Sequence, residues 1–250
     1  FRNPQFALTM MAGFVFGAGL FASGYFIPIF VQTIQNYSAT RAGLLLATGG
    51  VVMMIFFPLS GRITDSIPAH IPIATGLLIF SIGFFMIRAV DVNTTFWVMA
   101  AYTAVNRVGL SLAIPSLSVS ALRAVSADKL ARAASVGTFF RNFGGGLGIT
   151  LLTAFFLQRS QYHGEAFTDT QTWANGTTVE LLGDIRHLLA GTGLPEVIQK
   201  AGALNYLGEV VLAQASTLAF KDTFLAISLV GFLAVGPAWM IGRTGRRARD

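Results

Sequence analysis

One apolar stretch, residues 96–122, constrains the fold of this chain more than any other part of its sequence. It reads FWVMAAYTAVNRVGLSLAIPSLSVSAL, long enough to cross a lipid bilayer, and its only charged residue is Arg107. A guanidinium at the bilayer centre costs about 2.5–3.5 kcal/mol or more, so Arg107 should face protein or a water-filled cavity. Pro115 is expected to break the same helix, and a broken membrane helix needs neighbours to satisfy its freed carbonyls. The stretch therefore predicts a bundle of membrane helices around it.

The composition agrees with a protein of the lipid bilayer. The 250 residues are 54% hydrophobic and 11% charged, whereas soluble domains carry about 25% charged residues. The net charge is +6, but the basic residues form short islands between apolar runs. This arrangement is typical of juxtamembrane charge rather than of a nucleic-acid-binding groove, so no nucleic-acid partner is expected. The absence of cysteine excludes disulfides and thiolate chemistry.

The apolar runs predict an all-α integral membrane protein with six transmembrane helices, at residues 6–31, 42–59, 71–87, 96–122, 133–157 and 224–241. Pro58 is expected to end the second helix. Under this topology one side of the membrane holds a cluster of basic residues, and the short turns on the other side hold only Arg41 and Arg88; the basic residues of the first side are Arg2, Arg62, Arg123, Lys129, Arg132 and the four arginines of the tail. Because positive charge accumulates on the cytoplasmic side, both termini of this segment are predicted to be cytoplasmic.

Residues 158–222 interrupt the series of crossings. The segment is polar at first and then carries two amphipathic stretches, 179–189 and 195–219, with apolar residues at helical spacing. We expect three parts: residues 1–157 with the first five helices, an external (periplasmic) loop at 158–222 with amphipathic helices, and residues 223–250 with the last helix and a basic tail. The loop is either a spacer or a docking surface for a periplasmic adaptor protein.

A polar island, residues 61–70, follows the second predicted helix. Gly61, Arg62 and Asp65 lie in a segment that resembles a degenerate copy of the cytoplasmic loop signature of the major facilitator superfamily. In that family the glycine permits a tight helix exit, and the Asp interacts with a neighbouring helix end and helps to hold a closed state. Ser66, Pro68 and His70 depart from the family pattern, so an ordinary turn with one basic anchor is the alternative.

The fifth predicted helix carries a second resemblance. Its residues 134–148, ASVGTFFRNFGGGLG, are similar to a helix of the fourteen-helix drug:proton antiporters of the EmrB/QacA type. Further features of that family are Pro28 and Gln32 at the end of the first helix, SATRAG at residues 38–43, and Arg107, Gly109 and Pro115 in the fourth helix.

The resemblance implies that this chain is the C-terminal half of such a transporter, made of two inverted three-helix repeats. Its function would be proton-coupled efflux of small hydrophobic or amphipathic drugs by alternating access, in the bacterial inner membrane. The N-terminal half would be absent, which agrees with a first residue, Phe1, that is not Met. No cofactor is expected beyond the proton gradient as energy source. All Asp and Glu residues lie in predicted loops or at helix ends, so the proton site should lie in the other half.

Inverted repeats and Pro-interrupted helices point to a binding site near the middle of the bundle, and Pro28 and Pro115 lie in the first helix of each repeat. The candidate substrate cavity therefore combines aromatic, amide and cationic side chains: Tyr25, Phe26, Gln32, Tyr102, Asn106 and Arg107. The alternative for the aromatic residues is contact with lipid or simple packing. The remaining motif residues are assigned to helix packing: Pro28, Pro115, Arg141, Asn142, Gly144, Gly145 and Gly148. Arg141 is close enough to the cytoplasmic end of its helix for its side chain to reach that surface.

An enzyme is not expected. His70, His163 and His187 are scattered over different predicted loops, without the spacing of a metal site or a catalytic group. The GGGLG sequence lies inside a predicted membrane helix rather than after a strand, so it does not predict a phosphate-binding loop. The alternative to a transporter is a six-helix membrane scaffold or assembly module, although a scaffold has little use for a charge at membrane depth.

Overall fold

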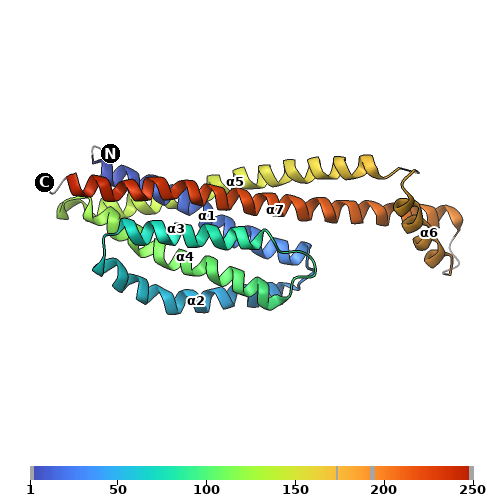
Figure 1. Ribbon diagram of the computed structural model, residues 1–250, viewed down its shortest axis with the longest axis horizontal. Helices are drawn as coiled ribbons and strands as arrows, with labels where there is room; N and C mark the ends of the chain where they lie inside the picture. Colours follow the sequence, from blue (N-terminus) through green and yellow to red (C-terminus); the bar gives the residue numbers. More distant parts are fainter. Residues whose placement is uncertain (1–2, 173, 192–194, 248–250) are drawn as a thin grey trace. The chain divides into compact units, whose positions relative to one another are not determined.

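The computed structural model describes residues 3–172, 174–191 and 195–247, with side chains as far as Gly242 (Figure 1). These residues form α1 (Pro4–Thr33), α2 (Ala39–Ser66), α3 (His70–Ile87), α4 (Phe96–Arg123), a short 3-10 turn η1 (Ala127–Lys129), α5 (Leu130–Thr170), α6 (Gly176–Ala190) and α7 (Glu196–Arg247). No strand occurs in these ranges. The chain divides into two compact units, Phe1–Ala154 with Lys221–Asp250, and Phe155–Phe220.

Six helices of the described chain are long and apolar enough to cross a membrane. They are α1, α2, α3, α4, α5 (counted with η1) and α7, and each contains one of the apolar runs read from the sequence. The prediction of an all-α membrane bundle with six transmembrane helices is therefore confirmed.

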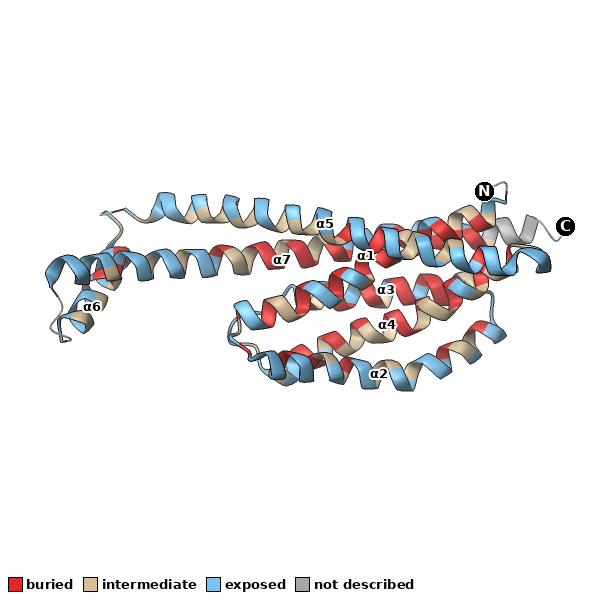
Figure 2. Ribbon diagram, turned by 180° about the vertical axis from the view of Figure 1, so that it is seen from behind, coloured by how far each residue is buried: buried red, intermediate tan, exposed pale blue. Residues whose placement is uncertain are grey.

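Helix α4 lies between α3 and α2 in both ribbon views (Figure 1, Figure 2). It packs tightly on α3, because a Cβ added to Gly109 would collide with the backbone of Phe80, and one added to Gly76 would lie 2.8 Å from the carbonyl oxygen of Gly109. Buried hydroxyl pairs join α4 to its other neighbours: Thr64 to Ser116 at 2.7 Å and Thr9 to Ser120 at 2.9 Å between Oγ atoms. Small residues and interhelical hydrogen bonds are what hold membrane helices together.

Helices α1 and α5 also approach closely within the first unit. A Cβ added to Gly17 would collide with the carbonyl group of Arg141, and one added to Gly144 would collide with the carbonyl group of Phe14. Gly148 lies against Ala18, at 2.5 Å from an added Cβ to its methyl group. Glycine is required along this contact because the two backbones touch directly.

Burial differs strongly between the helices of the first unit, as the colours of Figure 2 show. In the most apolar part of α2 only 17% of residues are buried, compared with 56% in α3 and 50% in α4. The exposed side chains of α2 are large and apolar and include Met54 and Ile55. Helix α2 therefore presents an apolar face to the surroundings of the unit.

Two prolines were expected to interrupt helices, and both predictions were wrong. Pro58 lies inside α2, which continues to Ser66, and Pro115 lies inside α4. A proline removes only one backbone N–H, so a single carbonyl four residues earlier loses its donor, that of Met54 for Pro58 and that of Ser111 for Pro115. Membrane helices tolerate proline because neighbouring helices, hydroxyl side chains and small local adjustments can satisfy such a carbonyl.

The second unit contains the end of α5, the whole of α6 and the first part of α7. The rings of Phe156 and Phe220 lie 4.4 Å apart between centroids, and Arg186 forms an ion pair with Glu196 at 2.9 Å. Amphipathic helices were predicted here, but residues 158–170 were predicted to be a polar loop, whereas they continue α5 without a break. Side-chain pairs four residues apart, such as Gln161 with Glu165 at 2.8 Å, favour helix in this polar segment.

Candidate functional site

Three polar side chains lie on two adjacent turns of α4. Asn106 and Arg107 follow Thr103 by three and four residues, so both lie one turn after it. Thr103 and Asn106 are fully buried. The Oγ1 atom of Thr103, the Oδ1 atom of Asn106 and the Nε atom of Arg107 are buried without a hydrogen-bond partner in the described part of the chain. We call these three residues the α4 polar row.

Asn106 is held against α3. Its Nδ2 atom donates a hydrogen bond to the carbonyl oxygen of Phe80 at 3.3 Å. Gly83 permits the contact, since a Cβ at this position would lie 2.8 Å from the Cα atom of Asn106. One side of the amide is thus fixed, while its oxygen is left without a partner. A buried polar atom without a partner costs about 1–3 kcal/mol, so a native protein seldom retains one without a use.

Arg107 lies across α2. A Cβ added to Gly49 would lie 2.9 Å from its Cγ atom and 3.1 Å from its Nε atom, so the stem of the arginine rests on this glycine. The side chain as a whole is only partly buried. No described residue forms an ion pair with it, and the described acidic residues of the first unit, Asp65, Asp91, Asp128 and Asp222, lie outside the apolar runs.

The other residues predicted for the substrate cavity are placed differently from one another. Phe26 is buried, Tyr25 is 39% exposed, and their rings meet edge to face at 5.1 Å. Gln32 is exposed, and its Nε2 atom donates to the carbonyl oxygen of Pro28 within its own helix at 3.1 Å. Tyr102 directly precedes Thr103 in the sequence, and its side chain is half-buried. Only Asn106 and Arg107 among the predicted cavity residues carry buried polar atoms without a partner.

Two members of the site were not predicted. Thr103 is four residues before Arg107 on the same helix, and helical spacing alone could have included it. Gly49 gave no such signal, because the sequence does not show which glycine of α2 faces the arginine of α4.

The residues of the proposed gating motif lie in the last turns of α2 instead of a loop. Arg62 and Asp65 are exposed, and the Asp65 carboxylate has no hydrogen-bond or ion-pair partner in the described chain. A Cβ on Gly61 would meet nothing within 4 Å, so this glycine is not a tight helix exit. The connection from this region to a neighbouring helix is made by Thr64, through its hydrogen bond to Ser116.

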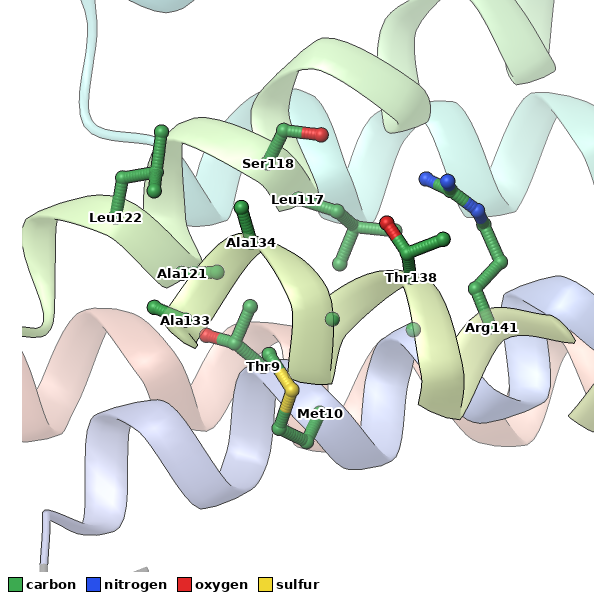
Figure 3. A pocket seen from close by; sticks show the side chains of 12 residues that line it. Thr9, Met10, Leu117, Ser118, Ala121, Leu122, Ala133, Ala134, Thr138 and Arg141 are labelled. Carbon is green, nitrogen blue, oxygen red and sulfur yellow. The ribbon is translucent and has the colours of Figure 1, made fainter. Parts of the chain in front are cut away.

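A separate cavity of about 130 Å³ lies between α1, α4 and α5 (Figure 3). Met10 of α1, Ser118 of α4 and Thr138 of α5 contribute to its walls, and so does Arg141. The Arg141 backbone faces α1, while its side chain extends away from α1 in Figure 3. The neighbouring Asn142 is exposed.

A larger cavity of about 210 Å³ lies between α1, α3, α5 and α7 and is almost entirely apolar. Gly144 and Gly148 form part of its wall, whereas Gly145 packs on the ring of Phe21. None of the six predicted cavity residues lines this cavity or that of Figure 3. Among the described residues there is also no group of three His, Asp or Glu side chains that could hold a metal ion.

Six helices long and apolar enough to cross a membrane, with buried polar atoms on one of them, define a polytopic α-helical membrane protein. Residues 1–149 match the family model described as Major Facilitator Superfamily, and the chain belongs to that superfamily. The chain also aligns with a solved structure of a bacterial homologue of the human lysosomal transporter Spinster, in an inward-facing and occupied conformation, with a TM-score of 0.61 at 16% identity. This alignment covers 97% of the present chain and 50% of the other, and it supports the fold.

Several curated relatives are similar to the chain. The multidrug transporter protein MdtP of Bacillus subtilis is 30% identical over 68% of this chain and 31% of its own length. The multidrug export protein EmrB of Haemophilus influenzae is 26% identical over 84% and 39%. The colistin resistance protein EmrB of Acinetobacter baumannii is 21% identical over 93% and 45%. The resemblance to the EmrB type is thus confirmed, and the chain spans between about a third and a half of these relatives.

Proposed function

We propose that this chain is one half of a membrane transporter that exports hydrophobic or amphipathic compounds by alternating access. The observation that carries the proposal is the α4 polar row, in a chain similar to proteins named for multidrug export. A second half would close the substrate path, and the two halves would rock about it. No observation favours the alternative of a membrane scaffold.

The α4 polar row supports this role because the Arg107 side chain is only partly buried and has no ion-pair partner among the described residues, so its guanidinium can bind a partner from outside the described bundle. In a transporter that partner is water, substrate or the opposite half, in turn, as the cavity opens and closes. A static scaffold would gain stability from pairing these groups permanently, because each buried unpaired atom costs about 1–3 kcal/mol.

The proton gradient is the proposed energy source. The apolar runs of this chain contain no Asp or Glu, so the carboxylate that would carry the proton belongs to the proposed other half. The excess of Lys and Arg on one side supports an inner-membrane location with both termini of this segment in the cytoplasm. The chain is not proposed to be an enzyme. The helices of the second unit offer a surface to a periplasmic adaptor protein, as a further part of the proposal.

The test uses the full-length natural protein, reconstituted in liposomes with an imposed pH gradient, and a panel of amphipathic dyes of both charges. We expect gradient-dependent movement of at least one dye, and a strong loss of that movement in Arg107→Ala at unchanged insertion and folding. Arg88→Gln, at an exposed turn, is the control for the loss of one positive charge and should transport normally. A protein that moves no dye of the panel would contradict the proposed function.

A further inference from the structure

We propose that the first unit binds an anionic phospholipid of the surrounding membrane, in a groove where α1 begins, α4 ends and α5 begins. The groove shares no residue with the α4 polar row. The inference rests on the proposed orientation of this end toward the cytoplasm, and it does not depend on which compound is exported.

The groove is an open cavity of about 430 Å³. Its walls come from the start of α1, the turn after α4 and the first turns of α5. Asn3 joins two of these walls, since its Nδ2 atom donates to the carbonyl oxygen of Ala124 at 2.7 Å and its Oδ1 atom accepts from the backbone N–H of Gln5 at 2.9 Å. The start of α1 is thereby bonded to the end of α4, so the groove has a fixed side.

The floor of the groove is apolar. Phe6, Ala124 and Ala133 line it and belong to one buried hydrophobic cluster, and the partly buried Val125 and Val136 line it and pack against the same cluster. The residues come from α1, from α5 and from the turn between α4 and α5. Such a surface fits the upper part of a lipid acyl chain, at the boundary between head groups and hydrocarbon.

Two cations line the same groove. Lys129 and Arg132 are exposed, and neither side chain has an ion-pair or hydrogen-bond partner in the described part of the chain. The carboxylate of Asp128 is next to Lys129 in the sequence, but Asp128 is not part of the groove. Lys and Arg both bind phosphate, and basic pockets between membrane helices on the cytoplasmic side bind anionic lipid head groups.

The combination of cations and apolar floor favours a lipid over other occupants. A free phosphate would use Lys129 and Arg132 but leave the floor exposed to water. An apolar protein segment would cover the floor but leave both cations unpaired. An anionic phospholipid supplies a phosphate and an acyl chain in one molecule, and the cytoplasmic leaflet is where such lipids gather.

The experiment counts the lipids retained by the purified full-length natural protein in mild detergent, by native mass spectrometry. The protein is titrated with phosphatidylglycerol or with phosphatidylcholine that has the same acyl chains. We expect preferential retention of phosphatidylglycerol. In Lys129→Gln/Arg132→Gln the apparent affinity for phosphatidylglycerol should fall about twentyfold, since each basic residue near an anionic lipid surface contributes about fivefold. Retention of phosphatidylcholine should not change.

Arg62→Gln/Arg123→Gln is the matched control. Both arginines are exposed, lie on the same proposed side of the membrane and are not part of the groove, so this variant removes two positive charges elsewhere and should retain phosphatidylglycerol normally. Val136→Trp, which fills the groove at unchanged charge, should weaken retention. Glycerol 3-phosphate, which carries the phosphate without acyl chains, should not compete.

The outcomes separate this inference from the proposed function. Equal retention of the two lipids by the unchanged protein overturns the inference and leaves the groove to the other half of the transporter. Equal losses in the two double variants, or competition by glycerol 3-phosphate, overturn it as well. Should Lys129→Gln/Arg132→Gln not yield a monodisperse protein, Lys129→Gln compared with Arg123→Gln decides in the same way. A protein that retains phosphatidylglycerol but moves no dye contradicts only the proposed function.

Discussion

Gly49 of α2 lies directly under the side chain of Arg107 of α4, so that a Cβ on the glycine would be 2.9 Å from the arginine Cγ and 3.1 Å from its Nε. The absence of a side chain at position 49 is what allows the arginine to lie across α2. A membrane arginine is thereby held by protein instead of extending into lipid, where it would be costly.

The first prediction follows from this contact. Gly49→Val should push the Arg107 side chain out of its position while leaving the bundle folded, because the displaced group is a flexible side chain and not backbone. Affinity for a transported compound that uses Arg107 should fall about tenfold, the equivalent of about 1.4 kcal/mol. Binding to the purified full-length protein measures the effect.

Gly50→Val is the matched control for this prediction. Gly50 is the next residue of the same helix, and a Cβ there would meet nothing within 4 Å. The two variants carry the same β-branched residue, so they share any cost in helix propensity. Equal affinities in the two variants would show that contact with Arg107 is not what Gly49 provides.

The second prediction concerns the contact between α1 and α5. Gly144→Ala should lower the thermal stability of the detergent-solubilised protein, because the added methyl group would collide with the carbonyl of Phe14. Gly146→Ala, where an added Cβ meets nothing within 4 Å, should be neutral or stabilising by up to about 1 kcal/mol from helix propensity. Fluorescence-detected size-exclusion chromatography after heating ranks the two. A Gly144→Ala protein as stable as Gly146→Ala would contradict the packing described here.

The third prediction concerns the buried hydroxyl pair that joins α2 to α4. Thr64 and Ser116 lie 2.7 Å apart between their Oγ atoms, and each hydroxyl also bonds to a carbonyl of its own helix. Because these local bonds remain, the hydrogen bond between the two helices should contribute little to the free energy of unfolding, about 0.6 kcal/mol as for comparable pairs in membrane proteins. A double-mutant cycle of Thr64→Val and Ser116→Ala, read by reversible unfolding, measures it. Strictly additive effects would show that the pair contributes nothing.

The fourth prediction concerns the turns that join α1 to α2 and α3 to α4. The guanidinium of Arg41 lies 4.1 Å from the ring centroid of Tyr37 and 5.9 Å from that of Phe96. Arg41→Gln should destabilise the protein by about 0.5–1 kcal/mol, the contribution of an exposed cation–π contact.

Thermal unfolding of Arg41→Gln against Arg88→Gln isolates the ring contact, because both variants remove one positive charge from exposed positions at these turns. Gln35 also links the two turns, with its Nε2 atom donating to the carbonyl oxygens of Asp91 at 2.9 Å and Thr94 at 3.2 Å. The loss in Arg41→Gln should therefore be partial. A melting temperature equal to that of Arg88→Gln would exclude a stabilising role for the ring contact.

The helices and their number could be predicted because hydrophobicity and length decide them locally. Each apolar run of the sequence lies in one membrane helix of the structure, since a backbone in lipid has to satisfy its own hydrogen bonds. The same reasoning failed where a polar segment is helical and where a proline lies inside a helix. Residues 158–170 are polar and helical, and Pro58 is a helix breaker in water that α2 accommodates.

Arg107 and Asn106 stood out in the sequence because a charge or an amide in an apolar run is costly wherever the run packs. The residues that contact them on α2 and α3 could not be identified from the sequence, because contacts between helices depend on crossing angles and on which face of each helix turns inward. The sequence by itself determined a bundle of apolar helices with an arginine at membrane depth. Only the tertiary structure decided that Gly49 supports this arginine, that Asn106 binds α3, and that the buried atoms of the α4 polar row are left unpaired.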